Sequence, residues 1–121
     1  GVQTCALPIF MQNPERARYW YMKYRIEGIV QLQELLESAM SNETFAAIHQ
    51  PVLTMCWYKD EHTQDSLVSV DAMRVMNDEL ATKDKTFLTL DAGAHEIGYG
   101  AESRSVTDVV AQCVRWIEQR R

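Results

Sequence analysis

Two residues in this chain have the types and positions that acid–base chemistry needs. Asp65 lies in a polar segment after the apolar run 52–58, and His95 lies in a Gly-containing segment after the run 86–90. In a catalytic triad, a carboxylate orients an imidazole, which takes a proton from the nucleophile and later gives it to the leaving group. An acid followed by a histidine predicts the last two members of such a triad.

The matching nucleophile is expected earlier in the chain, on a sharp Gly-x-Ser-x-Gly turn. None of the serines has this context: they are Ser38, Ser41, Ser66, Ser69, Ser103 and Ser105. We therefore expect the sequence to be the C-terminal part of an enzyme whose nucleophile lies outside these 121 residues. The chain is expected to be inactive by itself.

Other residues compete for these roles. Asp60 stands nearer to the end of the first run than Asp65 does, and it is a second candidate for the acid. The alternative for His95 is an ordinary surface histidine of a loop. The remaining histidines, His49 and His62, are expected to be solvated bystanders. A metal site at Glu61, His62 and Asp65 is disfavoured because the spacing matches no standard ligand set, so the sequence indicates neither a metal nor a cofactor.

The elements that must position this pair follow from the apolar pattern. Residues 52–58 are almost continuously apolar, which is typical of a strand buried on both faces of a parallel sheet, and residues 86–90 predict a second strand. Helical periodicity predicts a helix over 70–80, capped by Ser69, and another over 106–117, opened by a capping box at residues 105–108.

This alternation predicts an α/β fold in which two parallel strands are flanked by helices. Ligands and reactive groups in such sheets lie beyond the carboxyl ends of the strands. Asp65 and His95 follow neighbouring strands at that edge, so we expect the carboxylate to lie within hydrogen-bond reach of the imidazole.

The N-terminal part has a different character. Residues 1–9 lack an initiator Met and any charge, and they resemble the translation of a sequencing adapter, so we expect this segment to be an artefact that is extended and exposed. Residues 29–40 repeat apolar side chains with helical period, and a short helix is expected over 42–48, before Pro51.

Composition excludes several classes of partner. The net charge of -5 and the pI near 5.1 disfavour nucleic acid. No apolar run approaches the length that spans a membrane, and a cytoplasmic location is expected. Cys56 and Cys113 stand in no metal or redox spacing, so both are expected to be buried free thiols.

From about Ile48 onward the chain resembles the end of an α/β-hydrolase fold protein of the esterase, lipase and serine-peptidase type. The resemblance rests on a Pro-Val strand entry at residues 51–52, Asp-Ser-Leu-Val at 65–68, the strand at 86–90 and Gly-Ala-His at 93–95. The segment 58–73 is especially similar to the acid loop of monoacylglycerol-lipase-like bacterial hydrolases. One departure is Gly-Ala-His, where the family usually has Gly-His.

The resemblance implies a division of the chain and a chemistry. Residues 10–50 would be the end of a lid or cap, or its linking helices, and residues 51–121 would be the C-terminal part of a truncated three-layer core. Asp65 would be the acid, in preference to Asp60, because it precedes two apolar residues that anchor the next helix. His95 would be the general base in the cleavage of small carboxylic esters or amides through an acyl-enzyme.

Two other functions remain open from the sequence. One is a non-catalytic α/β binding module of flavodoxin-like type, although such a module would need Gly-rich strand-to-helix turns or an acidic cluster, and the Asp65 loop has neither. The other is an enzyme of the same fold with different chemistry, such as acyl transfer.

Overall fold

The structure, a computed structural model, describes residues 4–5, 14–19 and 24–121. Its chain divides into two units, 1–41 and 42–121, and each is described here by itself. Of residues 1–9, only β1 (Thr4–Cys5) is described, and it pairs antiparallel with β2 (Tyr24–Arg25). The expectation for the rest of that segment lies outside the described residues.

The first unit also contains α1 (Arg16–Tyr19) and α2 (Ile26–Ala39). The helix predicted over 29–40 is therefore present, but it begins earlier and follows directly from β2. None of the α2 residues is buried, and its apolar face is open to solvent. No helix in the described part of the chain combines the length and the apolar character needed to cross a bilayer.

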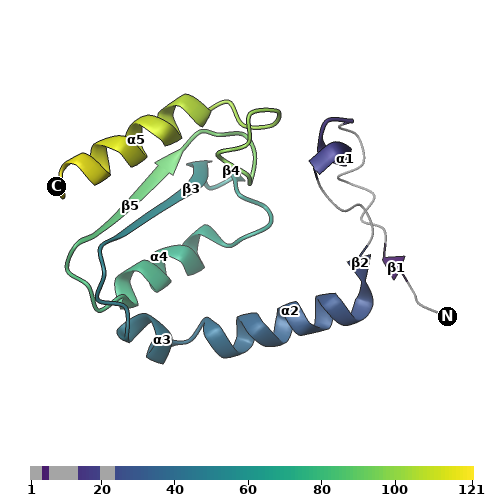
Figure 1. Cartoon of the computed structure of the whole chain (residues 1–121), viewed down its shortest axis with the longest axis horizontal. Helices are drawn as coiled ribbons and strands as arrows, with labels where there is room; N and C mark the ends of the chain where they lie inside the picture. Colours follow the sequence, from purple (N-terminus) through teal and green to yellow (C-terminus); the bar gives the residue numbers. More distant parts are fainter. Residues whose placement is uncertain (1–3, 6–13, 20–23) are drawn as a thin grey trace. The chain divides into compact units, whose positions relative to one another are not determined.

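The second unit is built on a parallel pair of strands, β3 (Val52–Asp60) and β5 (Lys85–Leu90). The pairing is continuous, from Val52 opposite Lys85 to Trp57 opposite Leu90. The predicted parallel pair is thus confirmed, and β3 extends two residues beyond the predicted end. In the parallel arrangement, both strands end at the same edge of the sheet (Figure 1).

The expected two-stranded sheet is corrected by a third strand, β4 (Thr63–Gln64). It pairs antiparallel with the end of β3, so the sheet is mixed and has the order β4-β3-β5. The hairpin turn is closed by side chains: Asp60 Oδ1 accepts from the His62 N–H at 3.0 Å, and Gln64 Nε2 donates to the Glu61 carbonyl at 2.9 Å. A polar strand of two residues has no alternating apolar pattern, so periodicity could not predict it.

One face of the sheet is covered by α4 (Val70–Glu79). Ser69 caps this helix as predicted, because its hydroxyl accepts from the Ala72 N–H at 3.2 Å. The buried Thr54 hydroxyl of β3 donates to Asn77 Oδ1 at 3.3 Å. Helix α3 (Asn42–Ala46) adjoins α4, and the N–H groups of Ala81 and Thr82 donate to the carbonyls of Phe45 and Ile48.

The opposite face carries α5 (Val106–Glu118), as Figure 1 shows. Trp116 Nε1 donates to the Thr86 hydroxyl of β5 at 3.2 Å. At the end of α5, Arg120 pairs with Asp84, and its guanidinium stacks 3.7 Å from the centre of the Trp116 ring. The second unit is therefore a mixed α/β structure with helices on both faces of its sheet.

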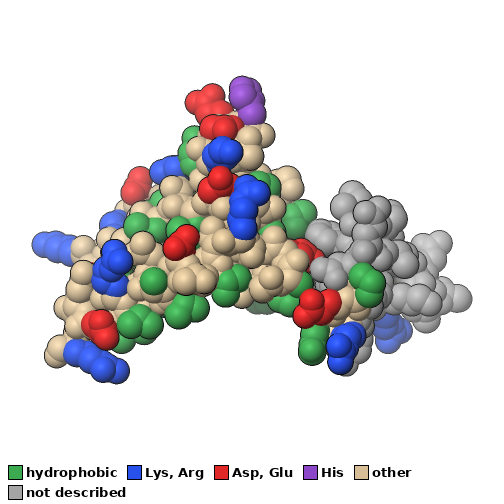
Figure 2. Space-filling model, turned by 90° about the horizontal axis from the view of Figure 1, so that it is seen from above, with side chains coloured by type: hydrophobic (Ala, Val, Ile, Leu, Met, Phe, Trp, Pro, Cys, Tyr) green, Lys and Arg blue, Asp and Glu red, His purple; other side chains and the backbone are tan. Residues whose placement is uncertain are grey.

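The hydrophobic core of the second unit is small. Its buried apolar residues are Phe45, Cys56, Val70, Leu80 and Ala92. Cys56 is a buried free thiol as expected, whereas Cys113 is a half-buried free thiol. Apolar side chains of α5 also reach the surface, and Figure 2 shows apolar and charged groups side by side on one face of the molecule.

The two valines of α4 test how much stability this core supplies. Val70 is 1% exposed and Val75 is 55% exposed, so Val70→Ala removes buried methyl groups and leaves a cavity, while Val75→Ala does not. We expect Val70→Ala to lower the free energy of unfolding by about 2 kcal/mol relative to Val75→Ala in urea titrations. Both variants make the same change on the same helix, although Val70 is its first residue and Val75 is in its middle. Helix propensity should favour Val75→Ala by only a few tenths of a kcal/mol, well below the expected difference. Equal stabilities would contradict the assignment of Val70 to the core.

Candidate active site

Asp65 is held in place by both its backbone and its side chain. It directly follows β4, and its N–H donates to the Trp57 carbonyl of β3 at 3.1 Å. One carboxylate oxygen, Oδ1, accepts from the Leu67 N–H at 2.9 Å and from the Val68 N–H at 3.0 Å. Such a bond from Asp to the backbone two residues on is typical of an Asx-turn. This turn leads into Ser69 and α4, so the start of the helix and the carboxylate orient one another.

The other carboxylate oxygen meets His95. Asp65 Oδ2 lies 2.6 Å from His95 Nδ1, and the two residues come from loops that follow different strands. The Asp65 side chain is only 3% exposed, whereas that of His95 is 38% exposed. The expected contact between the two residues is thus confirmed. With Nδ1–H donating to the carboxylate, Nε2 of a neutral ring is an acceptor for a proton from another group.

Opposing effects act on the charge of Asp65. Burial by itself would raise the pKa of this carboxyl group, but the hydrogen bonds from His95, Leu67 and Val68 lower it, and the net pKa is below its usual value. The hydrogen bonds therefore outweigh desolvation, and the group stays a carboxylate at neutral pH. A buried carboxylate in this position fixes the imidazole tautomer and stabilises the imidazolium when it forms.

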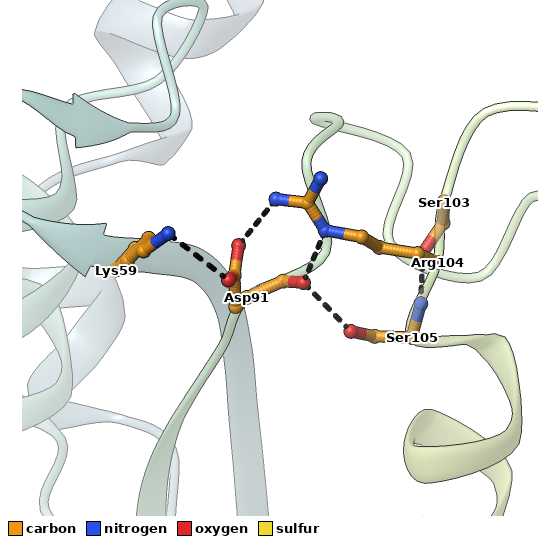
Figure 3. Close-up of polar contacts among 5 residues, drawn as sticks. All are labelled: Lys59, Asp91, Ser103, Arg104 and Ser105. Atoms are coloured by element: carbon orange, nitrogen blue, oxygen red, sulfur yellow. Dashed lines mark hydrogen bonds and ion pairs between the residues drawn. The ribbon is translucent and has the colours of Figure 1, made fainter.

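The loop that carries His95 connects β5 to α5 and contains a second polar cluster (Figure 3). Arg104 donates to Asp91 twice, from Nε to its carbonyl at 3.2 Å and from Nη2 to Oδ1 at 2.6 Å. Lys59 Nζ approaches Asp91 Oδ2 at 3.8 Å from the end of β3. The hydrogen bond from Arg104, with its charge and that of Lys59, holds the pKa of Asp91 below its usual value.

The predicted capping box of α5 is wrong. Ser105 makes no side-chain cap bond, and its hydroxyl donates instead to the Asp91 carbonyl at 3.1 Å. Ser103 Oγ accepts from the Ser105 N–H at 3.1 Å. Both serines are buried, and the bond from Ser105 to Asp91 ties the start of α5 to the end of β5. The Ser-x-x-Asp pattern at residues 105–108 predicted a bond within the first turn of the helix. The Ser105 hydroxyl instead bonds Asp91, which is distant in sequence.

The other candidates take different places. The Asp60 carboxylate accepts a bond within the exposed β3–β4 hairpin, while Asp65 holds the imidazole. His49 and His62 are exposed. Among the residues that the structure describes, no group of three or more His, Cys, Asp or Glu side chains is arranged to hold a metal ion. The sequence did not identify Asp91 and Arg104, because no local pattern links them.

The charge of Asp65 predicts a specific pH dependence. The pKa of Asp65 is lowered from about 3.9 in an unstructured chain. Its contribution to stability is therefore complete above about pH 4 and is lost as the pH falls through the lowered value. We expect the free energy of unfolding of Asp65→Asn to fall less steeply with acid in urea titrations between pH 5 and 2. Asp84→Asn, at an exposed ion pair, should have a smaller effect. Identical slopes for Asp65→Asn and the unchanged chain would contradict this electrostatic account.

A second prediction concerns the turn that presents His95. Gly93 has φ +74°, and a Cβ at this position would lie 3.0 Å from Arg104 Cζ. Gly93→Ala should cost about 1–2 kcal/mol, because an L residue is strained in this backbone region. At Gly98 a Cβ would meet no atom within 4 Å, so Gly98→Ala is the matched control and should change stability by less than about 0.5 kcal/mol. Thermal unfolding of the two variants measures the difference, and equal melting temperatures would remove the special role of Gly93.

Comparisons with known proteins do not assign a family or a function to this chain. The chain matches no protein-family model, no curated protein and no solved structure. The chemistry of Asp65 and His95 therefore rests on their own contacts and surroundings.

Proposed function

We propose that this chain supplies the acid and the histidine of a serine-hydrolase triad that cleaves carboxylic esters or amides through an acyl-enzyme. One observation carries the proposal: the buried Asp65 carboxylate lies 2.6 Å from Nδ1 of the half-exposed His95. In this pair, Asp65 is the orienting acid and His95 is the general base and acid.

The exposure of the two side chains matches the two roles. An orienting acid works best when it is shielded from water and hydrogen-bonded, as Asp65 is. A general base must reach solvent or substrate on its other ring nitrogen, and the imidazole of His95 is exposed enough to do so.

The position of the pair in the fold also supports the proposal. Asp65 follows the β3–β4 hairpin and His95 follows β5, so both lie beyond the carboxyl ends of the parallel strands. This is where doubly wound sheets place their reactive groups. We propose on this basis that residues 51–121 are the C-terminal part of an α/β-hydrolase core, with α4 and α5 as its two helical layers.

The mechanism requires a nucleophilic serine from a segment that these 121 residues do not include. His95 Nε2 would take the proton from that serine as it attacks the carbonyl carbon of the substrate. The imidazolium would be held by Asp65 and would then protonate the leaving alcohol or amine. Water, activated by the same Nε2, would release the acid product from the acyl-enzyme.

The test uses the complete protein that includes this chain, assayed with p-nitrophenyl esters. We expect His95→Ala and Asp65→Asn each to lower kcat by about 10⁴-fold, because both remove a member of the triad. His62→Ala and Asp60→Asn, in the exposed hairpin, should keep the activity within a few-fold of the unchanged enzyme. The 121-residue chain alone should be inert. Full activity in His95→Ala, or a loss in Asp60→Asn as large as in Asp65→Asn, would refute the assignment.

A further inference from the structure

The loop between β5 and α5 begins with the turn that carries His95, and a residue near the end of the same loop contacts this turn. The turn comprises residues 91–95, which run from the first residue after β5 to His95 itself. Arg104, just before α5, contacts three consecutive residues of this turn, Asp91, Ala92 and Gly93, and these contacts are called the Arg104 clamp below. We propose that Arg104 is a positioning residue that sets this turn so that the His95 ring meets Asp65. Its effect on catalysis rests on the function proposed above, but its effect on the His95 ring does not.

The first part of the clamp acts on Asp91. The Arg104 guanidinium donates from Nε to the Asp91 carbonyl at 3.2 Å and from Nη2 to the Asp91 carboxylate at 2.6 Å. It therefore restrains the main chain and the side chain of the same residue. A planar guanidinium can make both bonds at once with a defined angle between them, whereas the point charge of a lysine cannot.

The second part acts on Ala92 and Gly93. The Arg104 N–H donates to the carbonyl of the fully buried Ala92 at 3.0 Å. The guanidinium lies against Gly93, because a Cβ there would come within 3.0 to 3.3 Å of three guanidinium atoms. The left-handed backbone of Gly93 and the side chain above it therefore fit together as one unit (Figure 3 shows the Asp91 side of the cluster).

Asp91 in turn is the point where three elements meet. Lys59 reaches its carboxylate from β3, and the Ser105 hydroxyl donates to its carbonyl from the start of α5. The Arg104 clamp thus connects the turn that carries His95 to β3, β5 and α5.

The solvent exposure of the Arg104 clamp indicates that it positions the His95 turn more than it stabilises the folded chain. The side chains of Arg104 and Asp91 are 63% and 45% exposed. Solvent screens such ion pairs, and they contribute little to global unfolding. The hydrogen bond between His95 and Asp65 is short, and the Asp65 side chain is buried. A small displacement of the turn would therefore break this bond. Removing Arg104 is therefore expected to disturb His95 far more than it disturbs the fold.

The experiment is NMR of the ¹⁵N-labelled 121-residue chain. The readouts are the low-field Nδ1–H signal of His95 and the ring ¹⁵N shifts that report its tautomer, with Asp65→Asn identifying the signal. In the unchanged chain we expect the Nδ1–H tautomer with a protected low-field proton. Arg104→Ala should abolish that signal and leave a mixture of tautomers, while the melting temperature changes by only a few degrees. Both variants keep the main-chain bond from residue 104 to Ala92. Arg104→Lys also keeps the positive charge but loses the two-pronged guanidinium, so it should show a weakened signal.

Arg120→Ala is the matched control, because it removes the arginine–aspartate pair between Arg120 and Asp84 at the other end of α5. It should leave the His95 spectrum unchanged even if the melting temperature falls. An intact His95 signal in Arg104→Ala would overturn the proposal, and so would an equal loss in Arg120→Ala. If Arg104→Ala does not fold, an unaltered signal in Arg104→Lys would overturn it in the same way.

The complete enzyme provides a second, separate readout. Misplacement of a catalytic group by about 1 Å can cost about 10²-fold in rate. Arg104→Ala should therefore lower kcat by about that factor with little change in KM. If the complete protein hydrolyses no ester, the proposed function fails, but the NMR result still decides whether Arg104 positions His95.

Discussion

The parallel pairing of β3 with β5 is the constraint on which the rest of this unit depends. Its continuous register brings Trp57 opposite Leu90, so the two chains leave the sheet at the same edge. Every polar group of the candidate site is attached to that edge. Asp65 is tied to the Trp57 carbonyl, His95 follows β5 by a short turn, and Asp91 is the first residue beyond it. A shift in this register would separate the acid from the imidazole, whatever the loops did.

Two kinds of electrostatic contact lie at this edge of the sheet, and they have different effects. Asp65 is buried, and three hydrogen bonds offset the desolvation of its charge, so its pKa falls despite burial. Asp91 is exposed, and its ion pairs with Arg104 and Lys59 are screened by water. The first contact defines the chemistry of the imidazole. The second contributes little to stability and is better understood as a restraint on the loop that carries it.

The surrounding packing is sparse. Few apolar side chains are buried, and Val110, Val114 and Ile117 of α5 are about half exposed. Trp57 Nε1, at the edge of the site, is buried without a hydrogen-bond partner among the described residues, which is an unfavourable feature in a small core. The geometry of the site therefore depends on directional contacts, namely the Asx-turn at Asp65, the hairpin beside it and the Arg104 cluster. Such contacts specify angles well, but each can be lost by one substitution.

The sequence by itself determined the local elements and the candidates for the pair. Apolar runs and helical periodicity predicted β3, β5, α4 and α5, because burial on a regular element leaves a periodic pattern. Strand ends are where α/β folds place reactive groups, which pointed to His95 and left Asp60 and Asp65 both open as the acid. The contact with His95 is made by Asp65. Only the tertiary structure decided the rest. The two-residue strand β4 leaves no pattern, Ser105 bonds Asp91 instead of capping α5, and Arg104 acts on a residue 13 positions away. The contact between Asp65 and His95 spans 30 positions. These features depend on distances through space, which are set by the pairing of the strands and not by the neighbours of each residue in the chain.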